Sequence, residues 1–166
     1  GRKEVLNGKA KFGIFGDGKE LAQIIMAKFF KNGDFRSGYY RDQTFMMAIG
    51  ELSIKEFFAA LYANTDIEKE PHSSGRQMGA HFSTKTIDKN GEWLDLTNRK
   101  NTSSDISCTA AQMPRLIGLG LASKIYRQNK ELKKFNKFSN NGDELAFGTI
   151  GDASTSNSDL GAALEN

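Results

Sequence analysis

The chain of 166 residues contains a single cysteine, Cys108, which excludes an internal disulfide and fits a reducing compartment. It has no stretch apolar enough to span a membrane. Its net charge is only +3 and is spread evenly, which argues against a nucleic-acid partner. The one basic run, residues 124–137, also carries apolar side chains and Glu131, as a solvated helix face does. We therefore expect neither a membrane nor a nucleic acid as partner.

What the sequence does contain predicts a folded domain. Hydrophobic residues make up 38% and charged residues 26%, a balance typical of a soluble globular chain. The length suits one domain with a real core. Residue 1 is Gly1 rather than Met, and Asn166 would fall inside a helix that has only just begun. We therefore expect residues 1–166 to be one partial domain, truncated inside the helix that follows Gly151 and Asp152.

Helices are predicted where apolar residues recur at helical spacing. Such spacing follows residues 16–18, occupies residues 43–49 and 116–127, and follows Ser53, which opens a capping box with Glu56. Trp93 is expected to pack against the core. We expect these helices to be structural and the functional residues to lie outside them.

The stretch that carries chemistry is residues 144–164. Residues 145–150 are mostly apolar and predict a buried parallel strand, and residues 151–154 break it before a helix. A strand that turns directly into a helix places backbone N–H groups where open α/β sheets bind anions. Asp152 would repel a phosphate there unless a divalent cation lay between them. The stretch therefore predicts a site for a metal ion and a diphosphate.

Residues 150–156 resemble the glycine–aspartate–glycine motif that binds thiamine diphosphate, in the variant found in 2-oxo acid dehydrogenase complexes. The variant belongs to the alpha part of their decarboxylase (first) component. Three further segments agree with this family in order and spacing: Tyr40-Arg41, residues 75–81 and residues 107–114. The resemblance covers nearly the whole chain. Residues 75–81 are similar to a loop of the branched-chain (2-oxoisovalerate) members, which carry Gly-Arg-Gln-Met and a histidine there.

The resemblance implies an α/β thiamine-diphosphate-binding fold, a parallel sheet flanked by helices, of which this chain holds the N-terminal portion. It implies thiamine diphosphate and Mg²⁺ as cofactors. The diphosphate would be bound by the turn after the strand, made of Gly151, Asp152, Ala153 and Ser154, with Asp152 as a ligand of Mg²⁺.

The same resemblance assigns roles to five other residues. Tyr40 and Arg41 match a tyrosine–arginine pair that family members use on the cofactor diphosphate. Ser107 and Thr109 would line the middle of the cofactor. His81 would help to order its loop near the active site. The proton transfers are not assigned to His81, because the catalytic histidines of the family lie in segments that this chain does not contain.

The chain departs from the family pattern at several positions. Ala153 replaces the second glycine of the motif, and Asn157-Ser158 replaces an acid–glycine pair. Cys108 and Ala111 replace residues that are usual in a loop that binds potassium in some members, which argues against bound potassium. The second metal ligand of the motif, an asparagine, would lie beyond Asn166.

The implied reaction is oxidative decarboxylation of a 2-oxo acid, as in branched-chain amino acid degradation, with the acyl group passed to a lipoyl carrier. A branched-chain acid is favoured over pyruvate. The implied partners are a beta part, fused or separate, in a two-alpha two-beta assembly, and the lipoyl acyltransferase component. The expected location is the bacterial cytoplasm, or the mitochondrial matrix in a eukaryote. The fragment by itself is expected to be inactive.

Three alternatives stay open at this point. A transketolase-like transferase would use the same cofactor, although residues 75–81 argue against it. A non-catalytic scaffold of the same fold would explain the departures at Asn157 and Ser158. A Rossmann nucleotide binder would need spaced glycines after its strand, and residues 151–156 lack them. Residues 16–18, Gly-Asp-Gly, match the cofactor triplet by letter, but we interpret them as the approach to a helix.

Overall fold

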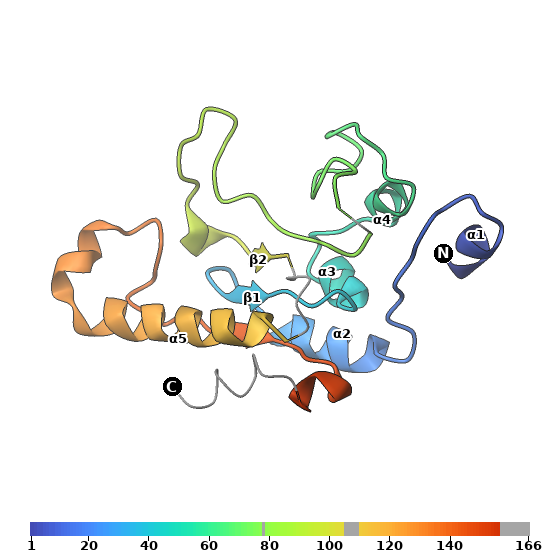
Figure 1. Cartoon of the computed structure of the whole chain (residues 1–166). Helices are drawn as coiled ribbons and strands as arrows, with labels where there is room; N and C mark the ends of the chain where they lie inside the picture. Colours follow the sequence, from blue (N-terminus) through green and yellow to red (C-terminus); the bar gives the residue numbers. More distant parts are fainter. Residues whose placement is uncertain (78, 105–109, 157–166) are drawn as a thin grey trace. The chain divides into compact units, whose positions relative to one another are not determined.

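The computed structural model describes residues 1–77, 79–104 and 110–156 (Figure 1). The chain divides into two compact units. The first comprises Gly1–Phe30 and Tyr40–Ser83, and the second comprises Lys31–Tyr39 and Thr84–Asn166. Among its described residues the first contains the helices α1 (Arg2–Leu6), α2 (Glu20–Phe29), α3 (Gln43–Ala48) and α4 (Ile54–Leu61). The second contains β1 (Phe35–Ser37), η1 (Leu96–Asn98), β2 (Asn101–Ser103), α5 (Gln112–Gln128), η2 (Lys130–Lys134), β3 (Ala146–Gly148) and η3 (Asp152–Ser156).

The first unit is helical because its sequence has helix starts and apolar spacing. At α4 the predicted capping box is formed: Ser53 Oγ accepts from the Glu56 N–H at 3.2 Å, and Glu56 Oε2 accepts from the Ser53 N–H at 2.7 Å. Helices α2 and α3 pack on each other. The core includes Phe45 and Met46, and the Phe30 ring meets that of Phe45 edge-on at 5.2 Å. The Gly-Asp-Gly segment at residues 16–18 precedes α2, as predicted.

The second unit is built on a parallel sheet with the strand order β2-β1-β3. Phe35 pairs with Asn101 on one side and with Ala146 on the other, so the three strands begin at the same level. Helix α5 follows β2 in the chain and packs against β1 and β3 (Figure 1). This arrangement confirms the predicted α/β class.

The amino ends of the three strands are joined through one buried residue, Asp34. Its Oδ1 accepts from the Leu145 N–H at 2.8 Å, and its Oδ2 accepts from the Lys31 N–H at 2.7 Å. Its carbonyl oxygen accepts from the Asn101 N–H at 3.1 Å. A buried carboxylate needs such donors. Asp34 thereby fixes the level at which β2 and β3 start beside β1, and so where all three strands end.

Two details of the prediction are wrong. The strand after Glu144 is parallel, as predicted, but it is half-buried rather than buried, because it lies at an edge of the three-stranded sheet. Trp93 does not belong to the core: it is 52% exposed and meets Phe138 edge-on at 5.2 Å. None of the helices in the described part of the chain is long and apolar enough to cross a membrane.

Candidate functional site

The candidate site of the second unit is the turn that follows β3 at the carboxyl edge of the sheet. The Ser154 N–H donates to the Gly151 carbonyl at 2.9 Å, and the Thr155 hydroxyl donates to the Asp152 carbonyl at 2.7 Å. These bonds curl the chain into η3 directly after the strand. Asp152 and Ala153 are exposed, whereas Ser154 is buried. The turn therefore exposes the Asp152 side chain at the start of η3.

Tyr39 explains why a glycine stands at the head of this turn. The Tyr39 side chain is buried, and a Cβ placed on Gly151 would lie 2.7 Å from its hydroxyl oxygen. The same Cβ would lie 3.3 Å from Ser154 Oγ. Any larger residue at position 151 would push the turn off Tyr39. Sequence reasoning missed Tyr39, because nothing local in the sequence shows that β1 ends beside β3.

A buried polar network ties this edge of the sheet to the start of α5. Ser37 Oγ, at the end of β1, donates to the Gln112 carbonyl at 2.8 Å. Gln112 Nε2 donates to the Thr149 carbonyl, just after β3, at 2.9 Å. Ser37 and Gln112 are both buried, so the bond between them is shielded from water, and the bond to Thr149 is partly buried. The network holds the residue that leads into Ile150 and Gly151.

Two arginines lie at the same edge of the sheet. Arg36, on β1, is only 3% exposed and donates to the Tyr39 carbonyl at 3.0 Å. Arg115, in the first turn of α5, donates to Ser103 Oγ at 2.8 Å and to the Ser104 carbonyl at 2.6 Å. These bonds hold both guanidinium groups at the carboxyl ends of β1 and β2. Such an edge favours an anionic ligand.

The first unit holds the predicted pair Tyr40 and Arg41. Arg41 Nη1 donates to the Tyr40 hydroxyl oxygen at 3.2 Å, and its guanidinium carbon lies 4.9 Å from the centre of the Tyr40 ring. The hydroxyl oxygen acts as the acceptor in this bond. A pair arranged in this way can offer a charged fork and a hydroxyl to one phosphate.

Two glutamines hold the backbone of that pair. Gln23, buried on α2, donates to the Arg41 carbonyl at 2.8 Å and accepts from the Phe45 N–H at 2.9 Å. Gln43 Nε2 donates to the Tyr40 carbonyl at 2.8 Å. Sequence reasoning missed both glutamines, because polar residues on a helix are usually solvated.

The loop of residues 75–81 in the first unit is held by a residue that precedes it, Glu70. This carboxylate is fully buried and accepts from the Gly75 N–H at 3.0 Å and from the Ser73 hydroxyl at 2.7 Å. Gly75 has a φ of +71°, and a Cβ there would lie 2.6 Å from the Ala63 carbonyl oxygen. His81 lies at the other end of the loop and is half-buried. Its role in ordering the loop stays a prediction.

The pKa of Glu70 follows from competing causes. Burial raises it, but hydrogen bonds from Gly75, Ser73 and His72 outweigh burial and bring it below the ordinary value of 4.5. Glu70 therefore stabilises the folded state fully above pH 4.5, and this contribution is lost as the pH falls through its folded pKa.

The lowered pKa of Glu70 predicts how the stability of a Glu70→Gln variant depends on pH. At pH 7 the variant is less stable to unfolding by about 1–3 kcal/mol, because buried donors lose a charged acceptor. The difference from wild type stays constant down to about pH 4.5 and shrinks below it. Urea unfolding of both proteins across the acid range measures it; a difference that grows on acidification would contradict the assignment.

The other predicted site residues have mixed outcomes. Gly151, Asp152, Ala153 and Ser154 share one turn in the second unit, and Tyr40 and Arg41 share one contact in the first. Ser107 and Thr109 lie outside the described residues, as do Cys108, Asn157 and Ser158. The roles predicted for all of them stay predictions.

The turn fits a metal ion that is shared with a bound diphosphate. Within the described ranges, no three residues among histidine, cysteine, aspartate and glutamate gather closely enough to hold a metal ion. Mg²⁺, however, commonly uses one or two carboxylates together with phosphate oxygens and water. Asp152 therefore fits as one ligand of a Mg²⁺ ion whose other ligands are diphosphate oxygens and water. The described side chains do not fit a metal site made of protein ligands only.

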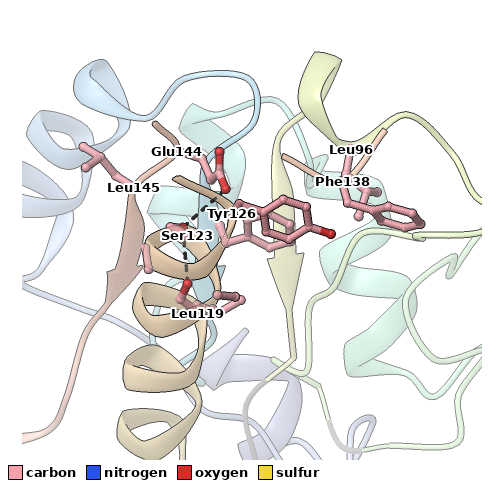
Figure 2. Close-up of a pocket in the computed structure, with 10 residues that line it drawn as sticks. Leu96, Leu119, Ser123, Tyr126, Phe138, Glu144 and Leu145 are labelled. Carbon is pink, nitrogen blue, oxygen red and sulfur yellow. Dashed lines mark hydrogen bonds between the residues drawn. The ribbon is translucent and has the colours of Figure 1, made fainter. Parts of the chain in front are cut away.

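A separate hollow of about 170 Å³ lies at the amino ends of β1 and β3 (Figure 2). Its wall is mostly apolar and includes Leu119 and Tyr126 of α5. The Glu144 carboxylate in it accepts from Ser139 Oγ at 2.6 Å and from Ser123 Oγ at 3.3 Å. Because open α/β sheets bind ligands at the carboxyl ends of their strands, this hollow is not the candidate cofactor site.

Comparison with known proteins agrees with the geometry. The family described as dehydrogenase E1 component matches residues 3–165 of the chain. Over 142 residues the chain is 31% identical to 2-oxoisovalerate dehydrogenase subunit alpha of Bacillus subtilis (strain 168). This alignment covers 82% of the chain and 37% of that relative, so the chain spans little more than a third of the relative's length.

Proposed function

The chain belongs to the dehydrogenase E1 component family, and we propose that the protein containing it oxidatively decarboxylates a 2-oxo acid with thiamine diphosphate. The observation that carries this proposal is the turn after β3. A glycine fitted against buried Tyr39 and an exposed Asp152 stand at the carboxyl edge of a parallel sheet. Open α/β sheets bind their ligands at this edge.

On this proposal the turn holds the diphosphate end of the cofactor. The backbone N–H groups of Gly151, Asp152 and Ala153 would bind the phosphate oxygens, and the Asp152 carboxylate would share Mg²⁺ with them. Ser154, whose own N–H donates to the Gly151 carbonyl, would close the turn beside them. Tyr40 and Arg41 would bind the diphosphate through the hydroxyl and the guanidinium. Ser107 and Thr109 would line the middle of the cofactor.

Thiamine diphosphate, when bound, supplies the nucleophilic carbon and the electron sink for decarboxylation. The part of this chain is to bind and orient it. The Ser37–Gln112–Thr149 network fixes the chain that enters the turn, and the buried Arg36 holds the Tyr39 carbonyl beside it. A rigid frame spares the site from reorganising when the cofactor binds.

A branched-chain acid is the proposed substrate, supported by residues 75–81 and by the name of the B. subtilis relative. The test is steady-state turnover by the full-length protein with thiamine diphosphate, Mg²⁺ and an electron acceptor. We expect a higher kcat/KM for 2-oxoisovalerate than for pyruvate. Turnover only of a ketose with an aldose acceptor would favour a transketolase-like transferase. A folded protein that binds no cofactor would favour a non-catalytic scaffold.

We further propose that the chain assembles with other chains of its complex, namely a beta part and the lipoyl acyltransferase component. Supporting this, Ile117, Leu121 and Ile125 form an exposed apolar stripe along α5, and Gly118 and Gly120 have open space around them among the described residues. Light-scattering molar mass of the full-length protein, alone and with a beta part, tests the assembly; a monomer in both samples would contradict it.

The cytoplasm of a bacterium is the proposed location, supported by the bacterial source of the relative. Cell fractionation with an antibody against the protein tests it. Recovery of the protein in the membrane or secreted fraction would contradict it.

A further inference from the structure

Glu70 is a fully buried acid that none of the proposed cofactor contacts uses. Its carboxylate faces four donors from the five residues that follow it. Glu70 Oε1 accepts from the His72 N–H at 3.0 Å. Its Oε2 accepts from the Ser73 N–H at 2.9 Å, the Ser73 hydroxyl at 2.7 Å and the Gly75 N–H at 3.0 Å. One carboxylate thus fixes the path of the chain from His72 to Gly75.

The backbone of this segment takes a conformation that needs such support. Ser74 and Gly75 both have positive φ angles, +53° and +71°. Consecutive left-handed residues are unfavourable for an L-residue such as Ser74 unless the surroundings impose them. Here the N–H groups of His72, Ser73 and Gly75 converge on one anion, as the N–H groups of a backbone nest do, while the Ser74 N–H donates to the Glu70 carbonyl at 3.2 Å. The anion is the Glu70 carboxylate, so the chain itself supplies the acceptor for these N–H groups.

The far end of the loop is tied to the same segment through His72. Its Nδ1 lies 2.9 Å from the Ser83 carbonyl oxygen and 3.2 Å from the Ser83 nitrogen. The His72 ring also meets the Phe82 ring edge-on at 5.4 Å. Because Glu70 holds the backbone of His72, both ends of the loop depend on one carboxylate.

Between these two ends the loop exposes Arg76 and Gln77. Both line a hollow of about 450 Å³, together with Lys9, Lys11 and Tyr62. Lys9 lies 3.8 Å from Glu4, so Lys11 and Arg76 carry the surplus positive charge of the wall. A hollow with this charge suits a carboxylate ligand. Glu70 itself is buried and is not part of the wall.

Burying a carboxylate is costly, and such groups are kept where they fix a particular conformation. We infer that Glu70 is a positioning residue, which holds the loop so that Arg76 faces the carboxylate of a 2-oxo acid in this hollow. This inference rests on the proposed function, because the family resemblance puts residues 75–81 near the active site. Glu70 acts through the loop and touches neither substrate nor cofactor.

The test is Glu70→Gln in the full-length protein, with thiamine diphosphate and Mg²⁺ bound. The matched control is Glu68→Gln, an exposed acid two residues away. We expect the KM for 2-oxoisovalerate to rise about tenfold in Glu70→Gln, with kcat and cofactor affinity within about twofold of wild type. Arg76→Gln should raise KM by a similar factor. Glu70→Asp, which keeps the charge, should recover part of the loss.

A second readout does not depend on activity. Arg76 is a trypsin site on an exposed loop, so cleavage after it reports how firmly the loop is held. We expect cleavage to be at least about fivefold faster in Glu70→Gln than in wild type or Glu68→Gln. If Glu70→Gln does not fold, Glu70→Asp serves in both assays, with smaller effects in the same direction.

The outcomes separate this inference from the proposed function. Unchanged cleavage would overturn the positioning role. Faster cleavage with unchanged KM would show that the loop does not present Arg76 to the substrate, and would overturn the inference while 2-oxo acid turnover stood. A wild-type protein that neither binds thiamine diphosphate nor turns over a 2-oxo acid would refute the proposed function and the substrate part of this inference, whereas the cleavage assay would still decide the role of Glu70.

Discussion

Replacing Asp152 by alanine in the full-length protein is expected to abolish Mg²⁺-dependent binding of thiamine diphosphate. Loss of a group that only supports a metal ligand costs 10- to 100-fold in affinity, so loss of the proposed ligand should raise the Kd of the cofactor by more than about 100-fold. Without the cation, the diphosphate would also face the turn unneutralised. Calorimetric titration with and without Mg²⁺ measures the effect.

The fold should survive this substitution. Asp152 is exposed, and its side chain makes no hydrogen bond within the described part of the chain. Substitution at such a position changes stability by at most about 0.5 kcal/mol. The matched control is Asp143→Ala, another exposed aspartate of the second unit, which should bind cofactor like wild type. Unchanged cofactor affinity in Asp152→Ala would sink the assignment of this residue.

Gly142→Ala is expected to be the most damaging substitution for the second unit. Gly142 is buried with a φ of +77°, and a Cβ there would overlap the Ser123 carbonyl oxygen of α5 and lie 3.0 Å from the Arg127 nitrogen. The left-handed backbone and the overlap each cost about 1–3 kcal/mol, so the sum should be about 3 kcal/mol or more. The midpoint of thermal unfolding should fall by at least about 6 °C.

Gly120→Ala provides the matched control on α5 itself. A Cβ on Gly120 meets open space among the described residues, and the position is inside a helix. Alanine there should stabilise the helix by about 0.5–1 kcal/mol. Differential scanning calorimetry of both variants compares them. Equal midpoints for Gly142→Ala and wild type would show that the loop before β3 does not pack on α5 as described.

Helices α2 to α5 could be predicted from the sequence because their signals are local, whereas α1 was not predicted. Ser53 and Glu56 form the capping box that their spacing indicates, and α3 and α5 lie where apolar residues recur. In α2 the spacing of apolar residues predicted the helix but not which of its residues is buried. Leu21 and Phe29 are largely exposed, whereas Gln23 is buried. Its amide matches a carbonyl and an N–H far along the chain, a pairing that periodicity does not encode.

Two of the three strands could not be predicted. β1 and β2 are three residues long and read Phe-Arg-Ser and Asn-Thr-Ser, with no apolar alternation. Such segments become strands through pairing with distant partners, and Asp34 sets their register from outside them. The strand before Gly151 was predictable, because its apolar run is bounded by turn residues on both sides.

The candidate site, like the fold, was predictable where its sequence signal is local. The turn at residues 151–154 follows from an apolar run broken by Gly-Asp, and Asp152 is exposed there as the metal hypothesis requires. The different roles of the adjacent residues Tyr39 and Tyr40 were not predictable. Tyr39 packs under Gly151, while Tyr40 bonds Arg41. Glu70 was missed because it lies in a polar loop whose sequence does not show that its carboxylate is buried.

The central claim is that this chain carries a diphosphate-binding turn completed by Mg²⁺. The most direct test is calorimetric titration of thiamine diphosphate into the full-length protein, first with Mg²⁺ and then with EDTA. Tight binding that requires the cation is the predicted result, and the turnover assays then follow. A folded full-length protein that binds no cofactor under either condition would contradict the claim and favour the scaffold alternative.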